Sequence, residues 1–310
     1  MSSESFGKVA VLFGGSSAER AISIKSGEAV SKALRNVGLD VLDFDPSDST
    51  LNELKNLEVD RVLIMLHGRG GEDGSIQGAL QFLGLPYTGS GVLGSALAMD
   101  KIRSKGIFKS VGLPTAKYEV VSQADLPKLD VEALMADFEQ QIMVKPSHEG
   151  SSIGMTRVKE ADQLKAAIET ALKFDSEVLL EKFITGKEFT VSVLNGEALP
   201  SIQMETPRSF YDYEAKYHTS TTQYHCPSGL DKETEDRLAE ISLKAFSAVG
   251  ASGWGRVDLM QDENGDFFIL EVNTVPGMTE KSLVPMAAKV AGISFEELVL
   301  AVLKSSEIRR

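Results

Sequence analysis

Two Asn-Gly dipeptides in the last third of the chain, Asn195-Gly196 and Asn264-Gly265, restrict its fold more than any other feature. Asn-Gly between two runs of strand-forming residues is the strongest short-range signal for a β-hairpin. The sequence therefore predicts a largely antiparallel sheet in this part of the chain. The runs that flank the two turns are residues 189–194 and 198–204, and residues 254–261 and 266–272.

The second hairpin is predicted to have one polar and one apolar face. With Asn264 and Gly265 as a two-residue turn, Asp258 lies opposite Glu271 and Arg256 lies opposite Asn273. Because side chains alternate along a strand, all four point to the same face. The other face is apolar and would pack into a core. Its residues are Val257, Leu259, Leu270 and Val272.

The opposed carboxylates of Asp258 and Glu271 allow two interpretations. Like charges directly across a hairpin repel, and a Mg²⁺ ion between them would reverse the repulsion, since Mg²⁺ favours a few carboxylate oxygens together with phosphate and water. Alternatively, the face is solvated and Arg256 neutralises both acids. A strand that ends in Glu-x-Asn and runs into residues 274–277, Thr-Val-Pro-Gly, favours the metal site.

The first third of the chain alternates strands with helices. Residues 9–13 are a short apolar run, typical of a buried parallel strand, and apolar residues then recur at helical spacing until Gly38. Such alternation predicts a parallel sheet covered by helices, as in a Rossmann-like domain. Further strands are expected at residues 41–44 and 61–66, and a helix at residues 76–83.

Residues 86–91, PYTGSG, are a predicted domain boundary. We expect three units: residues 1–91, a middle unit of residues 92–184, and residues 185–310 with the hairpins. In the middle unit one helix should cover residues 92–110, and strands at 142–145 and 155–158 should flank a loop rich in Gly and Ser. Other expected elements are strands at 117–121 and 178–183, helices at 161–172 and 232–249, and a long loop at 205–229.

Three loops could bind ligands, and each has an ordinary structural explanation. In residues 145–154, small residues let backbone N–H groups approach phosphate oxygens and Lys145 adds a charge, although Gly and Ser are common in any turn. Residues 14–19 follow a strand, but Ser16 and Glu19 could simply form a capping box. Residues 67–74 also follow a strand, where parallel sheets collect ligands, or they form a flexible loop.

Composition excludes several classes of function. The chain has 32 basic and 45 acidic residues and a net charge of -13, which disfavours nucleic acid as a partner. Its single cysteine, Cys226, allows neither a disulfide nor a cysteine metal site within the chain. No apolar stretch approaches the roughly 20 residues of a membrane helix, and residues 1–7 lack the basic stretch of a signal peptide. We therefore expect no membrane association and a cytoplasmic protein.

Nine segments together resemble the D-alanine–D-alanine ligases, a family of the ATP-grasp superfamily. They occur in the family's order and span the chain from Val9 to about Pro285. The resemblance implies an α/β and α+β protein with the ATP-grasp fold: a Rossmann-like domain with a parallel sheet, a small central domain and a C-terminal domain with an antiparallel sheet. The segments are GGSSAER, LHGRGGEDGSIQG, PYTGSG, MDKIRSK, VKPSHEGSSIGM, EKFITGKEFTV, FYDYEAKY, GWGRVDLM and LEVNTVPGMTEKSLVP.

The resemblance also implies an activity. Members of the family phosphorylate the carboxylate of one D-alanine with ATP, and the amine of a second D-alanine then displaces the phosphate. The product, D-alanyl-D-alanine, serves peptidoglycan synthesis in the cell wall. ATP, two Mg²⁺ ions (with Mn²⁺ as an alternative) and a homodimer are implied as well.

Site residues follow from the resemblance position by position. Those that match contacts to ATP are Lys101, Lys145, Ser152, Glu181, Lys182 and Glu188, with Glu181 and Glu188 placed at the adenine amino group and the ribose. Those that match the metal ligands are Asp258, Glu271 and Asn273. Those that match substrate contacts are Glu19 and His67 for the first D-alanine, Arg256 and Gly277 for the oxyanion, and Ser282 and Leu283 for the second carboxylate.

Two residues of the long loop complete the implied site. Lys216 matches a group that neutralises the transferred phosphate, and Tyr217 matches the end of a hydrogen-bonded chain through Ser151 to Glu19 that closes the site. Exclusion of water would protect an acyl phosphate from hydrolysis. One departure from the family is Lys281, where many relatives carry histidine, and this leaves a local contact open.

Three other functions also suit parts of the sequence. A nicotinamide-dependent oxidoreductase would suit a Rossmann-like domain, but the first turn lacks the third glycine of G-x-G-x-x-G. A non-catalytic nucleotide-binding module has no need for Glu19, Arg256 and Tyr217. A ligase that makes D-alanyl-D-lactate or D-alanyl-D-serine is closer, and Tyr217 favours an amine as the acceptor.

Overall fold

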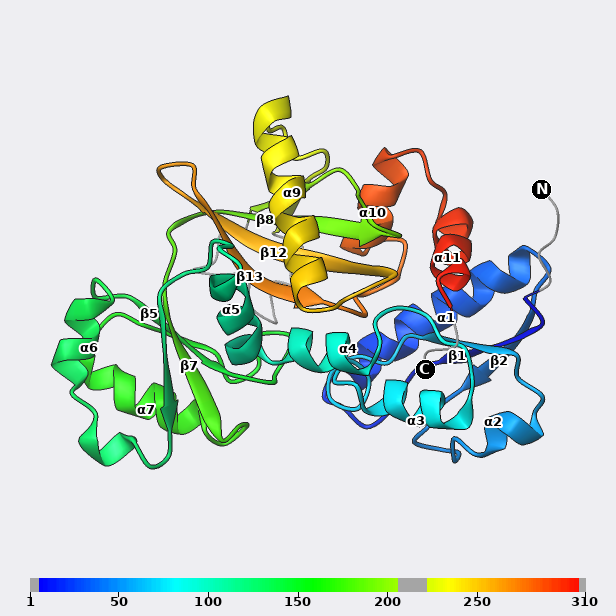
Figure 1. The fold of residues 1–310 in the computed structure, drawn as a ribbon, viewed down its shortest axis with the longest axis horizontal. Coiled ribbons are helices and arrows are strands. Elements are labelled where there is room, and N and C mark those ends of the chain that lie inside the picture. The colour runs from blue at the N-terminus through cyan, green and yellow to red at the C-terminus, as the bar shows by residue number, and fades with distance from the viewer. Residues whose placement is uncertain (1–5, 206–221, 307–310) are drawn as a thin grey trace.

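The computed structural model describes residues 6–205 and 222–306. Three sheets follow one another along an elongated molecule, with the N-terminal sheet at one end, the four-stranded sheet at the other and the six-stranded sheet between them (Figure 1). No helix in these described ranges is long and apolar enough to cross a bilayer.

The N-terminal sheet is parallel, as predicted, with strand order β2-β1-β3. Its central strand is buried along almost its whole length, which explains its continuous apolar sequence. The first helix stops before Gly38, whose φ of 83° suits glycine. The elements are β1 (Lys8–Leu12), α1 (Arg20–Asn36), β2 (Asp40–Phe44), α2 (Glu53–Asn56), β3 (Arg61–Ile64) and α3 (Ser75–Leu83).

The predicted helix at residues 92–110 is wrong in one respect, because it is two helices, α4 (Val92–Met99) and α5 (Lys101–Ser110). Asp100 breaks it: its backbone is extended and its side chain accepts hydrogen bonds from the amides of Ile102 and Arg103. Aspartate is a strong N-cap, so it ends one helix and begins the next. The break fixes the direction in which the first turn of α5 points.

The middle sheet is antiparallel, with strand order β4-β7-β5-β6, and two helices cover it. The expected strands at residues 142–145 and 155–158 pair with each other and flank the Gly- and Ser-rich loop. The elements are β4 (Tyr118–Ser122), the short 3₁₀ helix η1 (Leu126–Lys128), α6 (Val131–Asp137), β5 (Ile142–Pro146), β6 (Thr156–Val158), α7 (Ala161–Ala171) and β7 (Glu177–Lys182).

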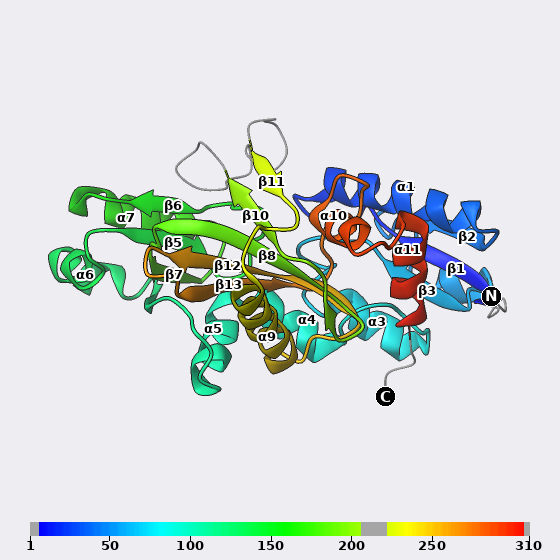
Figure 2. The same cartoon turned by 90° about the horizontal axis from the view of Figure 1, so that it is seen from above.

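The third sheet has six strands in the order β11-β10-β8-β12-β13, with β9 beside β8, and α9 packs across it (Figure 2). Of the helices that follow β13, α11 lies beside α1 and α10 packs against α11 (Figure 1). Both share the hydrophobic core of the N-terminal sheet. The proposed division at residues 91 and 184 stays a prediction. The elements are β8 (Gly186–Leu194), β9 (Glu197–Ala198), β10 (Ile202–Glu205), β11 (Gln223–His225), α9 (Lys232–Ala248), β12 (Trp254–Asp262), β13 (Phe267–Asn273), α10 (Leu283–Val290) and α11 (Phe295–Lys304).

The first hairpin has the predicted two-residue turn. Leu194 pairs with Glu197, and Asn195 and Gly196 both have positive φ, at 51° and 87°. These are the angles that a type I′ turn requires and that Asn-Gly adopts readily.

The second hairpin differs from the prediction in its turn but not at the site. Its loop has three residues, 263–265, closed by a hydrogen bond from the Gly265 amide to the Asp262 carbonyl. A bulge at Leu270 then restores the predicted pairs, Asp258 with Glu271 and Arg256 with Asn273. The prediction for Leu270 is wrong, because the bulge removes it from the buried face, where Ile269 packs instead.

Candidate active site

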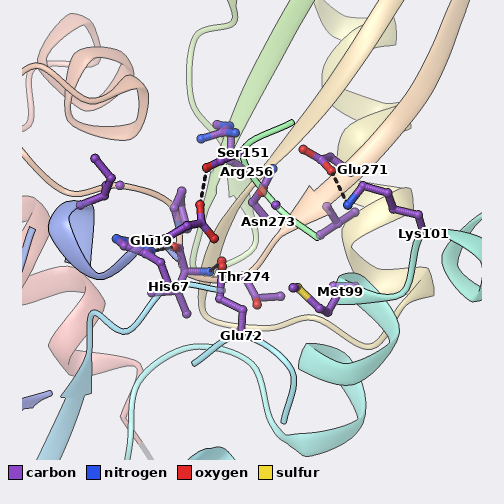
Figure 3. A pocket seen from close by; sticks show the side chains of 17 residues that line it. Glu19, His67, Glu72, Met99, Lys101, Ser151, Arg256, Glu271, Asn273 and Thr274 are labelled. Atoms are coloured by element: carbon purple, nitrogen blue, oxygen red, sulfur yellow. Dashed lines mark hydrogen bonds and ion pairs between the residues drawn. The ribbon is translucent and has the colours of Figure 1, made fainter. Parts of the chain in front are cut away.

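Two adjoining cavities lie where the three sheets meet. The larger encloses about 570 Å³ between the four-stranded and six-stranded sheets. The smaller, of about 70 Å³, lies between the loops of the N-terminal sheet and the end of β13 (Figure 3). Lys101, Gly150, Ser151 and Glu271 line both cavities. A molecule in one cavity would therefore be next to a molecule in the other.

Lys101 stands at the junction of the cavities because the Asp100 cap starts α5 there. Its ammonium donates to the Glu149 carbonyl at 2.7 Å and lies 3.2 Å from the Glu271 carboxylate. The side chain is largely buried, so the charge acts in a region of reduced screening. One lysine thereby connects the Gly- and Ser-rich loop with the six-stranded sheet.

Lys145 extends from the end of β5 toward the larger cavity, and its ammonium lies 2.5 Å from a carboxylate oxygen of Glu181. The other oxygen of Glu181 contacts Lys105, a fully buried residue that the sequence analysis did not single out. The two lysines outweigh burial and hold the pKa of Glu181 below its usual value. Since both oxygens are engaged, the expected contact of Glu181 with adenine stays a prediction.

The predicted metal ligands face one another on β12 and β13, but each acid has a cation beside it. Arg256 donates from Nε and Nη2 to the two oxygens of Asp258, at 2.8 and 2.7 Å. Asn273 Nδ2 and Thr190 Oγ1 also donate to Asp258, at 2.9 and 2.6 Å. Arg256 thus pairs with Asp258, and Lys101 pairs with Glu271.

The donor set fits magnesium bound together with a nucleotide. Asp258, Glu271 and Asn273 offer carboxylate and amide oxygens, the hard ligands that Mg²⁺ takes. The described ranges contain no cluster of three or more His, Cys, Asp and Glu side chains that could hold a metal by themselves. Phosphate and water oxygens would have to complete the coordination, which is the usual arrangement for Mg²⁺ at a nucleotide.

Glu19 points into the smaller cavity and does not cap the helix that it precedes (Figure 3). The capping box considered for Ser16 and Glu19 is therefore absent. The Glu19 carboxylate instead accepts a hydrogen bond from Ser151, a residue of the Gly- and Ser-rich loop, and both side chains are buried. Ser151 and Ser152 have positive φ, at 50° and 60°, so this loop is held in a conformation that non-glycine residues rarely adopt.

His67 lines the smaller cavity as a neutral imidazole. Burial lowers its pKa, and Nδ1 donates to the Val275 carbonyl at 2.7 Å, because a carbonyl can only accept. Nε2 is then the acceptor and lies 3.3 Å from Ser26 Oγ. The ring ties the N-terminal unit to the loop after β13. Its expected contact with a substrate carboxylate stays a prediction.

Glu72 is a site residue that sequence reasoning missed, although its loop was singled out. Its carboxylate accepts from the Gly68 amide at 2.6 Å and from the Val275 amide at 3.3 Å. Burial and the nearby charge of Glu19 raise its pKa to about 8. The signal that could have identified it is an acid inside a glycine-rich loop at the carboxyl end of a parallel strand.

The other predicted residues are distributed as follows. Ser152, Lys182 and Glu188 line the larger cavity, and Gly277 lines the smaller one. Ser282 lies next to Gly277 and accepts a hydrogen bond from the Thr279 amide, while Leu283 packs against the core of the N-terminal sheet. Lys216 and Tyr217 lie outside the described residues.

Comparison with known proteins identifies the family. Residues 107–304 match the model of the D-ala D-ala ligase C-terminus, and residues 43–90 match that of the N-terminus. A D-alanine–D-alanine ligase of Pseudoalteromonas atlantica is 61% identical over 97% of this chain and 95% of its own length. The chain belongs to the D-alanine–D-alanine ligase family. A ligase of Idiomarina loihiensis is 54% identical over 98% of both chains.

Solved structures of D-alanine–D-alanine ligases share the fold and confirm the predicted fold class. The enzyme of Bacillus anthracis complexed with ATP has a TM-score of 0.84 at 32% identity, over 96% of each chain. The VanG D-Ala:D-Ser ligase of Enterococcus faecalis has a TM-score of 0.81 at 30% identity, over 96% of this chain and 98% of its own. Because a ligase with a different acceptor shares the fold, the fold alone does not decide the second substrate.

In this member of the D-alanine–D-alanine ligase family, the charge of one histidine, His148, should make the stability of the fold depend on pH. His148, in the Gly- and Ser-rich loop, is held between two acids, with Nδ1 2.7 Å from Asp175 and Nε2 3.1 Å from Asp100. The hydrogen bond with Asp100 raises the pKa of His148 despite partial burial. Arg69 and Arg103 also lie near the two acids. When protonated, the imidazole can donate to both acids and so helps to hold the base of the loop in place.

We expect the stability contributed by His148 to fall as pH rises. A group whose pKa is raised by folding stabilises the fold fully below its unfolded pKa, about 6.5 for histidine, and loses that contribution as pH rises through the folded pKa. His148→Gln should therefore unfold at lower urea than the wild-type enzyme at about pH 6 and should differ less at about pH 9. His225→Gln, at an exposed pair with Glu205, is the control. An equal loss at both pH values would contradict the prediction.

Proposed function

We propose that the chain joins two molecules of D-alanine to D-alanyl-D-alanine, with ATP converted to ADP and phosphate, and so supplies a precursor of peptidoglycan. The observation that supports this most is the meeting of the two cavities at Lys101, Gly150, Ser151 and Glu271. The larger cavity suits a nucleotide, and the smaller suits an amino acid. The shared residues are located where a phosphoryl group would pass from one to the other.

In the first step, a carboxylate oxygen of the first D-alanine attacks the γ-phosphorus of ATP and ADP leaves. Glu19, buried at the start of α1, holds the ammonium of this D-alanine. Met260 and Leu270 line the larger cavity and pack against the base, with Glu188 at the ribose. Lys101, Lys145 and Ser152 contact the phosphates. Electrostatic stabilisation and positioning account for most of the catalysis in phosphoryl transfer.

Asp258, Glu271 and Asn273 would hold two Mg²⁺ ions, or Mn²⁺, against the phosphates. The metal ions supply positive charge for the oxygens of the transferred group. Arg256, now paired with Asp258, would then be able to turn toward the reacting carbonyl, because a metal ion would take over the neutralisation of that carboxylate.

In the second step, the free amine of the second D-alanine attacks the carbonyl carbon of the acyl phosphate. The C–N bond forms to give a tetrahedral intermediate, the C–O bond to phosphate then breaks, and phosphate leaves with the electron pair of that bond and the proton that the nitrogen loses. Arg256 and the backbone amide of Gly277 stabilise the oxyanion, an arrangement that typically contributes a large part of acyl-transfer catalysis. Ser282 and Leu283 hold the carboxylate of the second D-alanine.

Lys216 and Tyr217, which lie outside the described residues, complete the proposal. As the family resemblance implies, Lys216 would neutralise the transferred phosphate, and Tyr217 would extend the hydrogen-bonded chain of Ser151 and Glu19. We further propose a homodimer that works in the cytoplasm, where ATP is available, with neither nucleic acid nor membrane as a partner. Sedimentation at several protein concentrations tests the dimer.

Phosphate release from ATP tests the function. We expect release with D-alanine and Mg²⁺, and none with L-alanine alone, because L-alanine with its ammonium and carboxylate held in the same places would carry its methyl group where D-alanine carries hydrogen. D-Alanine with D-serine or D-lactate tests the acceptor, since one structural relative is a D-Ala:D-Ser ligase. Release with L-alanine as fast as with D-alanine would contradict the proposal.

A further inference from the structure

Lys105 is a lysine of α5 that the proposed mechanism does not use. It lies one helical turn after Lys101, so the two side chains project from the same face of the helix. Lys101 reaches Glu271 on the six-stranded sheet, whereas Lys105 reaches Glu181 on the four-stranded sheet. Lys105 is fully buried, and its ammonium also donates to Thr115 Oγ1 at 2.7 Å. A fully buried lysine is rare in proteins unless its charge is paired.

Glu181, Lys105 and Lys145 form a group of three charged side chains whose charges do not balance. One carboxylate serves two ammonium groups, with Lys105 at Oε1 and Lys145 at Oε2, and Glu181 is only 2% exposed. Burial lowers the pKa of Lys105, and its contact with Glu181 opposes that shift. With both lysines protonated, the three side chains together carry one positive charge, and of the two lysines it is Lys145 that lines the larger cavity.

This excess charge has a direct consequence for Lys145. If Glu181 had Lys145 as its only partner, the two would form a neutral buried pair. The Lys145 ammonium would then attract a phosphate oxygen less strongly. Because Lys105 occupies the second oxygen, Lys145 is only partly neutralised and keeps a stronger attraction for an anion. In a buried site of low dielectric such a difference in charge has a large effect on the electrostatic attraction between the lysine and an anion.

We propose that Lys105 is a positioning residue for ATP, which by binding Glu181 keeps the ammonium of Lys145 available to the phosphates. This inference rests on the proposed function, in which Lys145 contacts ATP. Lys105 itself touches neither cavity. A purely structural role is the alternative, since Lys105 also lies 3.4 Å from the Ile269 carbonyl and thereby links α5 to β13.

Titration of ATP and of adenosine with the purified enzyme separates the two roles. Lys105→Met removes the charge and keeps the length of the side chain, and Lys105→Gln removes the charge but can still donate to Glu181. We expect both variants to bind ATP about tenfold more weakly and to bind adenosine as the wild-type enzyme does. A tenfold change is the size expected for the loss of one of the weaker hydrogen bonds to a charged group. Lys109→Met, at an exposed position one turn further along α5, should bind both as the wild-type enzyme does.

The double variant Lys105→Met with Glu181→Gln provides the decisive comparison. Because Glu181 is also matched to an adenine contact, the double variant is compared with Glu181→Gln alone. With the carboxylate gone, Lys105→Met should weaken ATP binding far less than it does in the wild-type enzyme. The KM for D-alanine should change less than the KM for ATP in either Lys105 single variant. A structural role predicts further weakening in the double variant, with adenosine and D-alanine affected as much as ATP, and that result would overturn the inference.

Wild-type ATP binding by both Lys105 single variants would overturn it as well. The titration does not depend on turnover, so the proposed function is tested separately. If the wild-type enzyme released no phosphate from ATP with D-alanine, the proposed function would fail, whatever the affinities of the Lys105 variants.

Discussion

Asp258→Asn is expected to reduce the rate of ligation at saturating ATP and D-alanine by about a thousandfold, which corresponds to about 4 kcal/mol of transition-state stabilisation. The amide has one oxygen and no charge, so it is a poor ligand for Mg²⁺ opposite Glu271. The protein should still fold, because the remaining oxygen can accept from Thr190 and Arg256. Steady-state rates over a Mg²⁺ and Mn²⁺ titration, with thermal unfolding in parallel, provide the measurement.

Asp266→Asn is a matched control for this experiment. It makes the same chemical change on the same hairpin, at an exposed position beside the turn and away from both cavities. We expect its rate to be that of the wild-type enzyme. Normal turnover of the Asp258 variant at ordinary Mg²⁺ would remove Asp258 from the metal site.

Glu19→Gln is the second change with a large expected effect. A charged carboxylate that binds an ammonium contributes about 1.5 to 3 kcal/mol, and its loss should lower kcat/KM for D-alanine by about tenfold to a hundredfold. Glutamine keeps the size of the side chain and can still accept from Ser151. The KM for ATP should change little, because Glu19 lines only the smaller cavity.

Initial rates with each substrate varied in turn check this prediction. Glu28→Gln, at an exposed position on the same helix, makes the same substitution outside the site and should have wild-type constants. A Glu19 variant that lost affinity for ATP but not for D-alanine would exclude its assignment to the first substrate.

Local sequence patterns were sufficient for most of the fold. Apolar runs and helical spacing located the parallel sheet, and Asn-Gly located both hairpins. The break at Asp100 was missed because the apolar pattern continues across it, while the capping bond that causes the break is a property of one side chain. The bulge at Leu270 was missed for a similar reason. The three-residue loop shifts the strand pairing by one residue, and the bulge shifts it back. The predicted pairs are therefore correct beyond the bulge, near the site, and wrong between the bulge and the loop.

The site was predicted less completely, because its geometry depends on long-range contacts. Spacing on the hairpin predicted that Asp258 would face Glu271, and this is confirmed. The same spacing could not reveal that Lys101, from α5, would pair with Glu271. Glu72 and Lys105 lie inside two of the family segments, but no local pattern marks either of them. Their importance becomes visible only when their burial and partners are known.

The position of α10 and α11 determines when the hydrophobic core of the N-terminal sheet can be completed during synthesis. Residues 298–303 of α11 belong to the same hydrophobic core as residues 9–12 of β1, although the two segments lie far apart along the chain. During synthesis this sheet would stay partly uncovered until residues 298–303 have been made, while the middle sheet, whose core is made of residues 121–180, can close earlier. A nascent chain stalled before residue 295 would therefore present an apolar surface to chaperones and proteases, even though most of its nucleotide cavity had already formed.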